Sequence, residues 1–303
     1  MTIALTGATG FVGKAVLDEA QRREEPVRAL TRREQVWRDG VEWVAGTLDD
    51  GEALERMCRG SDAVLHVAGL TTSTNLADFE QANVEGTRNV IVAMKAARVK
   101  RLIFVSSLSA REPELSAYGA SKDEAEKLLE TSGLHWTIVR PPGVYGPRDV
   151  DYLEMFRSAK WGVVPIPPRG ASSIIHVADL ARLLLDLIDA SPALVRKRMF
   201  EPDDGREGGW SHKELARAIG DAVGRKVFAP QLPASAMRAA SKIDLLVRGR
   251  KARLTKDRVG YMLHPNWVAR SAHRIPRAVW EPRISGETGL RQTAEWYRRE
   301  GWL

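Results

Sequence analysis

The sequence predicts an α/β fold in which a doubly wound parallel sheet of the Rossmann type carries helices on both faces. Strand-like apolar runs alternate along the chain with runs whose apolar residues recur every three to four positions, which is the helical period. A glycine-rich turn separates the first strand from the first helix, and 303 residues suit one large α/β unit with a smaller lobe. We expect this lobe to be C-terminal and mostly helical.

The first strand and the turn after it carry the most specific signal in the chain. The apolar segment Thr2–Thr6 leads into Gly7, Gly10 and Gly13, and a run of helix formers follows. The first glycine permits a tight turn, the second lets the backbone approach a ligand, and the third lets the helix pack closely on the strand. Phosphate groups are attracted to a helix N-terminus by its free N–H groups and its dipole. A glycine turn in this context predicts a dinucleotide site.

Further strands and helices alternate after this turn. Strands are expected at Pro26–Thr31, Val41–Ala45, Asp62–Val67, Arg101–Ser106 and His135–Arg140, and a last strand at Arg198–Glu201 returns to the sheet. Helices are expected at Phe11–Arg22, Glu52–Cys58, Ala77–Ala97, Tyr118–Thr131 and Ala178–Asp189.

The expected domains follow from where these signals weaken. We expect residues 1–170 to form the nucleotide-binding domain, with residues 171–201 returning to it. Residues 202–303, together with 145–170, are expected to form a substrate-binding lobe. Its helices are predicted at Ser211–Val223, Pro233–Leu246 and Ser285–Arg299, and Trp267, Trp280, Trp296 and Trp302 are expected to anchor its core.

Composition excludes several classes of protein. The single cysteine, Cys58, excludes an internal disulfide and fits a reducing compartment, so we expect a cytoplasmic protein. No charged-then-apolar leader and no apolar run of about 18 residues is present, so no membrane span is expected. The histidines and the cysteine show no metal-ligand spacing, and we predict no metal site.

The charge of the chain is unevenly distributed. Residues 1–195 carry 23 Lys or Arg and 27 Asp or Glu, whereas residues 196–303 carry 23 and 12, so the net charges are −4 and +11. A basic half serves a nucleic acid, an anionic membrane or an acidic partner, or it is a solvated surface around a site for anionic ligands. We prefer the solvated surface and expect no nucleic-acid partner.

The end of the second strand indicates which dinucleotide binds. An acidic residue there would bind the ribose hydroxyls of NAD, whereas an arginine accommodates the 2′-phosphate of NADP. The chain has Thr31 followed by Arg32 and Arg33, which favours NADP(H) over NAD(H). Asp49 is expected near the adenine, or alternatively as a cap of the next helix. The small residues Ala68 and Gly69, after the fourth strand, leave room for a ligand at the switch point of the sheet.

A tyrosine and a lysine four residues apart carry the predicted chemistry. Tyr118 and Lys122 lie on one face of an expected helix, so the ammonium acts on the phenol. Because an unperturbed tyrosine has a pKa of about 10, a fixed cation that lowers this pKa makes the phenol a better proton carrier near neutrality. The pair then exchanges a proton with a substrate oxygen while hydride moves at the nicotinamide, and a serine after the fifth strand orients that oxygen.

Taken together, these motifs resemble the extended short-chain dehydrogenase/reductase superfamily over about the first 190 residues. The resemblance rests on Thr6–Gly13, Asn83–Thr87, Ser106-Ser107, Tyr118 with Lys122, and Arg140–Pro147. It implies Ser107, Tyr118 and Lys122 as the catalytic trio, with Lys122 also holding the nicotinamide ribose, and Ser106 and Ser109 as competing serines. It implies a largely structural role for Asn83, with a proton relay as the alternative role, and it implies a homodimer, because dimers are common in the superfamily. The expected cofactor contacts are Gly7, Thr9, Gly10, Phe11, Val12, Arg32, Arg33, Asp49, Ala68, Gly69, Lys122, Pro141, Gly143 and Val144, and the expected substrate contacts are Ser107, Ser109 and Tyr145.

The preferred function is an NADP(H)-dependent oxidoreductase that interconverts a carbonyl and a secondary alcohol on a small or medium organic substrate. An NAD-dependent nucleotide-sugar epimerase is the first alternative. The dehydratase subclass fits less well, because Leu108 and Ser109 follow Ser107 where that subclass has an acidic pair. The second alternative is a nucleotide-binding accessory or assembly subunit of a respiratory complex, which the segment Ser107–Ala110 and the basic C-terminal lobe resemble.

Overall fold

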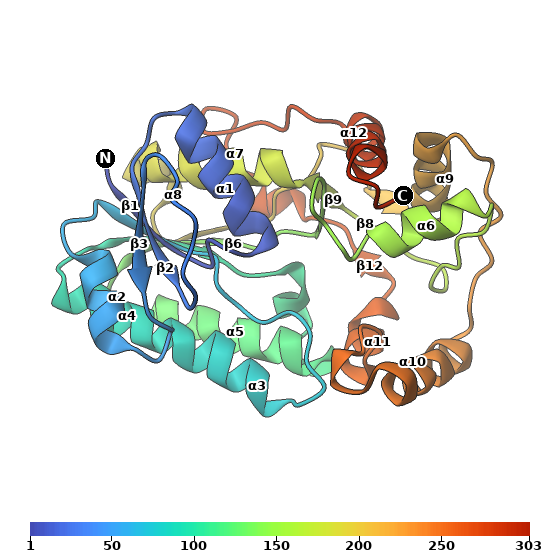
Figure 1. The fold of residues 1–303 in the computed structure, drawn as a ribbon, viewed down its shortest axis with the longest axis horizontal. Coiled ribbons are helices and arrows are strands. Elements are labelled where there is room, and N and C mark those ends of the chain that lie inside the picture. Colours follow the sequence, from blue (N-terminus) through green and yellow to red (C-terminus); the bar gives the residue numbers. More distant parts are fainter. The chain divides into compact units, whose positions relative to one another are not determined.

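A computed structural model describes the backbone of residues 1–303 and every side chain except that of Lys251. The chain forms two compact units (Figure 1). The first comprises residues 1–140, 180–200 and 275–280, and the second comprises 141–179, 201–274 and 281–303. The division therefore falls after Arg140, and residues 145–170, which the sequence pattern assigned both to the nucleotide-binding domain and to the lobe, lie in the second unit. Residues 171–179, which were expected to return to the first domain, also lie in the second unit, and the short segment Ile275–Trp280 belongs to the first.

The first unit is built on a seven-stranded sheet in the order β10-β6-β5-β4-β1-β2-β3. Every neighbouring pair is parallel, and the order reverses between β1 and β4, as in a Rossmann sheet. Most strands are buried apolar runs, which is the pattern of a parallel sheet covered on both faces. The strands are β1 (Ile3–Thr6), β2 (Val27–Thr31), β3 (Val41–Ala45), β4 (Ala63–His66), β5 (Arg101–Val105), β6 (His135–Val139) and β10 (Arg198–Phe200).

Helices cover both faces of this sheet (Figure 1). One face carries α1 (Phe11–Arg22) and α7 (Val177–Asp189), which an ion pair between Arg23 and Asp186 joins at 2.8 Å. The other carries α2 (Gly51–Cys58), α4 (Gly86–Ala96) and α5 (Ala117–Glu130), whose apolar residues form one core cluster with the strands. Each of these helices lies within a few residues of its expected position.

The expected helix Ala77–Ala97 is continuous but irregular. It begins as the short α3 (Ala77–Phe79), passes through a π-helical segment, η1 (Glu80–Glu85), and continues as α4. Periodicity does not reveal a π-turn, because one inserted residue changes the apolar spacing only locally. Such π-turns are often found at functional sites, and this one carries Asn83.

The second unit has two small sheets and several helices. Strands β7 (Gly143–Tyr145) and β9 (Ile174–His176) pair in parallel, and β8 (Ala171–Ser172) pairs with β11 (Trp210–Ser211) and β12 (Asn266–Trp267). The core lies between α6 (Leu153–Lys160), α9 (His212–Val223) and α12 (Gly286–Arg299). The remaining elements are α8 (Pro192–Val195, in the first unit), α10 (Ala234–Arg248), α11 (Lys256–Met262) and the short turns η2 (Leu108–Arg111), η3 (Pro113–Leu115), η4 (Gly249–Lys251) and η5 (Ser271–His273).

The tryptophans are divided between the two units. Trp302 stacks on Tyr297, and Trp296 packs edge-on against both rings, so these two tryptophans pack against the core of the second unit, as expected. Trp280 instead belongs to the first unit, where its ring packs on the guanidinium of Arg182 at 5.1 Å. Within the part of the chain that the structure describes, no helix has both the length and the apolar character needed to cross a bilayer.

Candidate nucleotide-binding and catalytic site

The glycine turn between β1 and α1 is shaped by backbone packing. Gly7 has a φ of +76°, and a Cβ there would lie 2.6 Å from the amide nitrogen of Ala68. A Cβ on Gly13 would overlap the carbonyl oxygen of Gly7, so the helix approaches the strand as closely as its backbone allows. Gly10 is the N-cap of α1 and supplies no side-chain cap, which leaves the first N–H groups of the helix uncapped by that residue. A turn of bare backbone at a helix N-terminus fits a pyrophosphate.

Other expected contacts of the turn lie around these glycines. Thr9 and Gly10 are exposed, and Phe11 and Val12 are half-buried in the first turn of α1. Ala68 and Gly69 follow β4, which is the strand paired with β1 at the reversal of strand order. The structure thus brings the glycine turn and the small residues after β4 to the same edge of the sheet.

A directional chain of hydrogen bonds runs through the buried His66 at the end of β4. Thr87 donates to the carbonyl of Asn83 at 2.6 Å, so its oxygen is free to accept from His66 Nε2 at 3.0 Å. On the other side, Thr6 accepts from the amide of Ala68 at 3.2 Å and donates to His66 Nδ1 at 2.6 Å. The network assigns the proton to Nε2. Burial, with the charge of Lys122 adding to it, lowers the pKa of His66 to about 3, so the ring is a neutral structural link.

Arg32 and Arg33 follow β2, and both are exposed. The hydroxyl of Thr31 donates to the carbonyl of Arg33 at 2.7 Å and accepts from its amide at 3.3 Å, which fixes the backbone of this turn. Neither guanidinium has an ion pair in the described part of the chain. Two unpaired cations on a fixed turn are available to an anionic group.

Asp49 does not cap the next helix. The cap of α2 is its neighbour Asp50, which accepts from the amide of Ala53 at 3.0 Å. Asp49 is exposed and accepts a 2.7 Å hydrogen bond from Gln81. The adenine contact expected of Asp49 stays a prediction.

Lys122 occupies a buried position on α5, one turn after Tyr118. Its ammonium donates to the carbonyl of Val105, the last residue of β5, at 2.9 Å, and lies 4.9 Å from the ring centroid of Phe104. Among the described residues this is its only hydrogen bond, so two of its three N–H donors have no acceptor in the protein. A Cβ on Gly69 would lie 3.0 Å from the lysine nitrogen, so the glycine keeps the space beside the ammonium open.

Burial lowers the pKa of Lys122 to about 8, and the negative charge of Glu126 partly opposes this shift. Glu126 lies one turn further along α5 and is itself buried. It accepts from the hydroxyl of Ser106 and from Nε of Arg140 at 2.9 Å. Sequence reasoning missed this buried acid, although its spacing of four from Lys122 repeats the spacing between Lys122 and Tyr118.

Three serines follow β5, and the structure gives them different partners. The hydroxyl of Ser106 donates its proton to the carboxylate of Glu126, so this proton is not available to a substrate. The oxygen of Ser107 accepts from the amide of Ser109 at 3.1 Å, which leaves its proton free to be donated. Ser109 is buried. Of the three serine hydroxyls, that of Ser107 best suits an acceptor outside the protein.

Close packing brings the start of α5 to the segment that follows β5. A Cβ on Gly119 would lie 2.6 Å from the carbonyl oxygen of Ser109, so only glycine permits this approach. Tyr118 is the preceding residue, and its ring lies 6.0 Å from that of Phe79. The polar positions Ser107, Tyr118 and Lys122 therefore converge near the C-terminal edge of the sheet.

Asn83 is held at this edge by its side chain. Its amide nitrogen donates to the carbonyl of Leu70 at 3.0 Å and to the hydroxyl of Ser121 at 2.9 Å. Its oxygen accepts from the amide of Leu70 at 2.7 Å. These contacts tie the π-helical segment to α5 and to the segment after β4.

The expected contacts beyond Arg140 belong to the second unit. Pro141 is buried, and Gly143 and Val144 lie in β7. Tyr145 is fully buried in the core of this unit, where its hydroxyl donates to the carbonyl of Gly286 at 3.3 Å. Its expected substrate contact stays a prediction, and its burial points to a structural role.

A bare glycine turn at a helix N-terminus, a buried lysine and a free serine hydroxyl on a Rossmann sheet are features expected of a nucleotide-binding oxidoreductase. A sequence model of the family described as NAD(P)H-binding matches residues 7–191. The chain belongs to this family, within the extended short-chain dehydrogenase/reductase superfamily, and is an NAD(P)-dependent enzyme.

Comparison with known proteins supports this assignment. A ceramide reductase of Caulobacter vibrioides is 34% identical over 99% of this chain and 96% of its own length. A 4-hydroxy-2-methyl-3-oxo-4-farnesyl-3,4-dihydroquinoline-1-oxide ketoreductase of Stigmatella aurantiaca is 30% identical, over 63% of this chain and 66% of its own. The solved structure of a UDP-glucose 4-epimerase of Thermus thermophilus in complex with NAD aligns with a TM-score of 0.73 over 98% of this chain and 99% of its own, at 21% identity, and shows the shared fold.

Proposed function

We propose that this enzyme is an NADP(H)-dependent reductase that interconverts a carbonyl and a secondary alcohol, with Ser107, Tyr118 and Lys122 as its catalytic residues. The observation that carries the proposal is the buried ammonium of Lys122, which has two free N–H donors and lies one turn from Tyr118. Burying a cation costs free energy, and a protein keeps one without an ion pair where it has a task.

The residues present fit a nicotinamide dinucleotide. The bare glycine turn would hold its pyrophosphate, Arg32 and Arg33 would bind the 2′-phosphate, and Lys122 would bind the nicotinamide ribose. When bound, the nucleotide supplies or accepts the hydride.

The protein's own groups handle the proton and the orientation of the substrate. The phenol of Tyr118 donates its proton to the carbonyl oxygen as that oxygen becomes an alcohol. The positive charge of Lys122 favours the phenolate that results. Ser107 donates its free hydroxyl proton in a hydrogen bond to the same oxygen and fixes its position.

We infer a lipid-like substrate from the two named relatives. Ceramide is a lipid, and the quinoline ketoreductase acts on a molecule with a farnesyl chain, as their names state. The relative with the longer match covers both units of this chain, which include the expected substrate-binding residues. We propose a ketone that carries a long hydrocarbon chain, reduced in a reducing compartment such as the cytoplasm. Burial raises the pKa of the Cys58 thiol to about 12, which suits an unreactive core residue.

The test of the mechanism is Tyr118→Phe, assayed with NADPH against ketones of increasing chain length. We expect kcat to fall by about 10²–10⁴-fold, because the general acid is lost. NADPH binding, followed by nicotinamide fluorescence, should be retained, and Tyr261→Phe serves as a tyrosine control in the second unit. Unchanged turnover in Tyr118→Phe would refute the mechanism, and NADPH that binds but never exchanges would favour an accessory subunit.

The test of the nucleotide preference is the double variant Arg32→Gln, Arg33→Gln. Charge-assisted hydrogen bonds contribute about 1.5–3 kcal/mol each, so NADPH affinity should fall by roughly a hundredfold or more, with little change for NADH. Arg56→Gln, at an exposed arginine on α2, is the matched control. A wild-type preference for NADH would refute this assignment and favour epimerase chemistry.

A further inference from the structure

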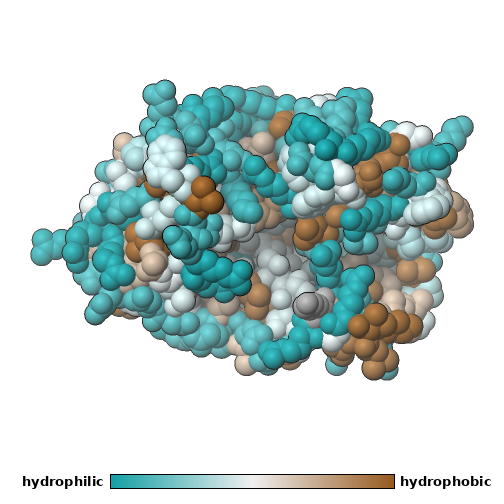
Figure 2. Space-filling view, viewed as in Figure 1, coloured by the Kyte–Doolittle hydropathy of each residue, from teal (hydrophilic) through white to brown (hydrophobic). Residues whose placement is uncertain are grey.

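The C-terminal half of α10 exposes its apolar side chains. Ile243, Leu245, Leu246 and Val247 are 60%, 48%, 85% and 77% exposed. Ala239, Ile243 and Leu246 recur at the spacing that places side chains on one helix face. Figure 2 shows apolar atoms gathered on the surface over this helix. Three consecutive exposed aliphatic residues are unusual on a protein surface without a function.

The opposite face of α10 holds the helix to its own unit. Met237 and Ser241 are buried. Asp244 accepts from the amides of Arg253 and Leu254, at 2.7 and 2.8 Å, and so folds the chain back on the helix. These contacts use the inward face, and the outward direction of Ile243 and Leu246 follows from them.

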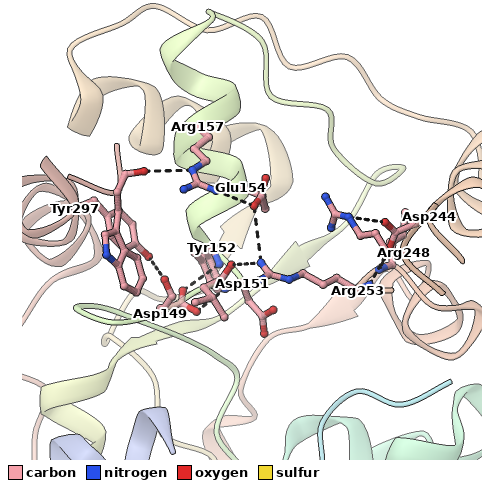
Figure 3. Close-up of polar contacts among 12 residues, drawn as sticks. Asp149, Asp151, Tyr152, Glu154, Arg157, Asp244, Arg248, Arg253 and Tyr297 are labelled. Atoms are coloured by element: carbon pink, nitrogen blue, oxygen red, sulfur yellow. Dashed lines mark hydrogen bonds and ion pairs between the residues drawn. The ribbon is translucent and has the colours of Figure 1, made fainter. Parts of the chain in front are cut away.

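Ion pairs fix the helical hairpin formed by α10 and α11 to the first turn of α6 and to the segment before it (Figure 3). Arg253 donates to the carbonyl of Val150 at 3.3 Å and lies 3.8 Å from the carboxylate of Glu154. Arg258 pairs with Asp151 at 3.0 Å. The hairpin is therefore attached by its inner side, and its apolar face is presented to the surroundings.

Basic residues surround the exposed apolar face. Residues 234–253 contain six Lys or Arg and one Asp, a net charge of +5. The single acid, Asp244, is engaged by the backbone of residues 253 and 254 and by Arg248 at 3.3 Å. Lys242, one turn before Leu246 on α10, is exposed, and so is Arg250 in the turn that follows the helix. An aliphatic face bordered by cations matches the hydrocarbon boundary and the headgroups of an anionic bilayer.

We propose that the outer face of α10 docks the enzyme on an anionic lipid bilayer, with the helix in the plane of the interface. Ile243, Leu246 and Val247 enter the headgroup boundary, and Lys242 and Arg250 contact lipid phosphates. A second copy of the chain is disfavoured as the occupant because two faces that each carry the exposed cations Lys242 and Arg250 repel each other. Nucleic acid is disfavoured because the exposed residues are aliphatic, whereas nucleic-acid surfaces add aromatic side chains on which bases stack. This inference rests on α10 and the turn that follows it, and it is independent of the reaction.

The test is flotation of the whole protein with phosphatidylcholine vesicles, with and without about 30% phosphatidylglycerol. We expect flotation only with the anionic vesicles, weakening as salt is raised. The charge variant Lys242→Gln, Arg250→Gln should lower the partition coefficient by roughly tenfold or more, because each Lys or Arg near the surface contributes about fivefold. The apolar variant Ile243→Glu, Leu246→Glu should abolish flotation.

Matched controls separate docking from general charge or folding effects. Lys95→Gln, Lys100→Gln removes two exposed lysines outside α10, and Val92→Glu alters an exposed valine of α4 that is 61% exposed. Both should float like the wild type. Thermal unfolding checks that the α10 variants are folded.

A labelled cysteine gives an independent measurement. Cys58 is the single native cysteine and is buried, so a fluorophore on Val247→Cys reports from α10. Anionic vesicles should shift its emission to the blue, and a label on Val92→Cys should not respond. The proposal is overturned if the wild type does not float, if the α10 variants float unchanged, or if sedimentation shows that these variants only abolish a dimer. None of these measurements needs substrate, so a negative result would refute the docking proposal without bearing on the proposed reaction.

Discussion

The helices α5 and α10 have nearly the same length, 14 and 15 residues, but they distribute polarity in opposite ways. Along α5, Tyr118, Lys122 and Glu126 are buried at successive turns. Along α10, Ile243 and Leu246 face outward. Burying charges and exposing aliphatic side chains both cost stability, so each arrangement points to a function that offsets this cost. For the buried polar groups of α5 we propose proton transfer, and for the exposed apolar face of α10 we propose docking.

The largest expected effect comes from removing the buried carboxylate of α5. Glu126→Gln takes away the charge that pairs with the largely buried guanidinium of Arg140, and it gives Ser106 a neutral acceptor. Breaking a buried ion pair by removing one partner costs about 3–5 kcal/mol. The free energy of unfolding, measured with urea, should fall by about this amount.

A control on the same helix makes this comparison specific. Glu130 is exposed at the end of α5, so Glu130→Gln should change stability by less than about 0.5 kcal/mol. Equal effects of the two substitutions would mean that burial of Glu126 does not matter to the fold.

The second prediction compares leucines on the two helices. Leu129 on α5 is 0% exposed, whereas Leu246 on α10 is 85% exposed. Leu129→Ala opens a cavity and should lower the free energy of unfolding by about 2–5 kcal/mol. Leu246→Ala should change it by less than about 0.5 kcal/mol, because leucine and alanine both favour helices and no packing is lost. A large loss of stability in Leu246→Ala would show that this face is covered in the free protein.

The two helices also show what the sequence reveals and what it does not. Apolar periodicity predicted both helices to within about two residues, and the spacing of Tyr118 and Lys122 predicted that these two residues share a face of α5, where both are buried. Periodicity tells which residues share a face but not whether that face points inward, so the orientation of α10 could not be predicted. The orientation of α10 depends on Asp244, whose carboxylate accepts hydrogen bonds from the amides of residues nine and ten positions later in the sequence.

The other features that the sequence did not predict also depend on contacts between distant residues or on very short elements. The bond from Ser106 to Glu126 and the pair of Glu126 with Arg140 join residues brought together only by the sheet. The boundary between units fell at residue 140 because β7 and β9, of three residues each, pair with each other, and strands so short show no alternation. The helix α11 is also short, at seven residues, and the sequence pattern did not predict it.

The smallest expected effect is a pH dependence that arises from burial of Lys122. Burial lowers the pKa of this ammonium to about 8, so the charged form predominates below this pH and is lost above it. In the direction of carbonyl reduction, kcat/KM should be level below about pH 8 and then decline by about tenfold per pH unit, or about 1.4 kcal/mol.

Glu126 sharpens this prediction, because its negative charge raises the pKa of Lys122. In Glu126→Gln, assayed at a temperature where the variant is folded, the decline should begin at lower pH than in the wild type. Glu130→Gln should leave the profile in place. A wild-type profile that stays level to pH 10 would show that the charge of Lys122 is not needed for turnover, and the burial of polar groups along α5 would then need another explanation.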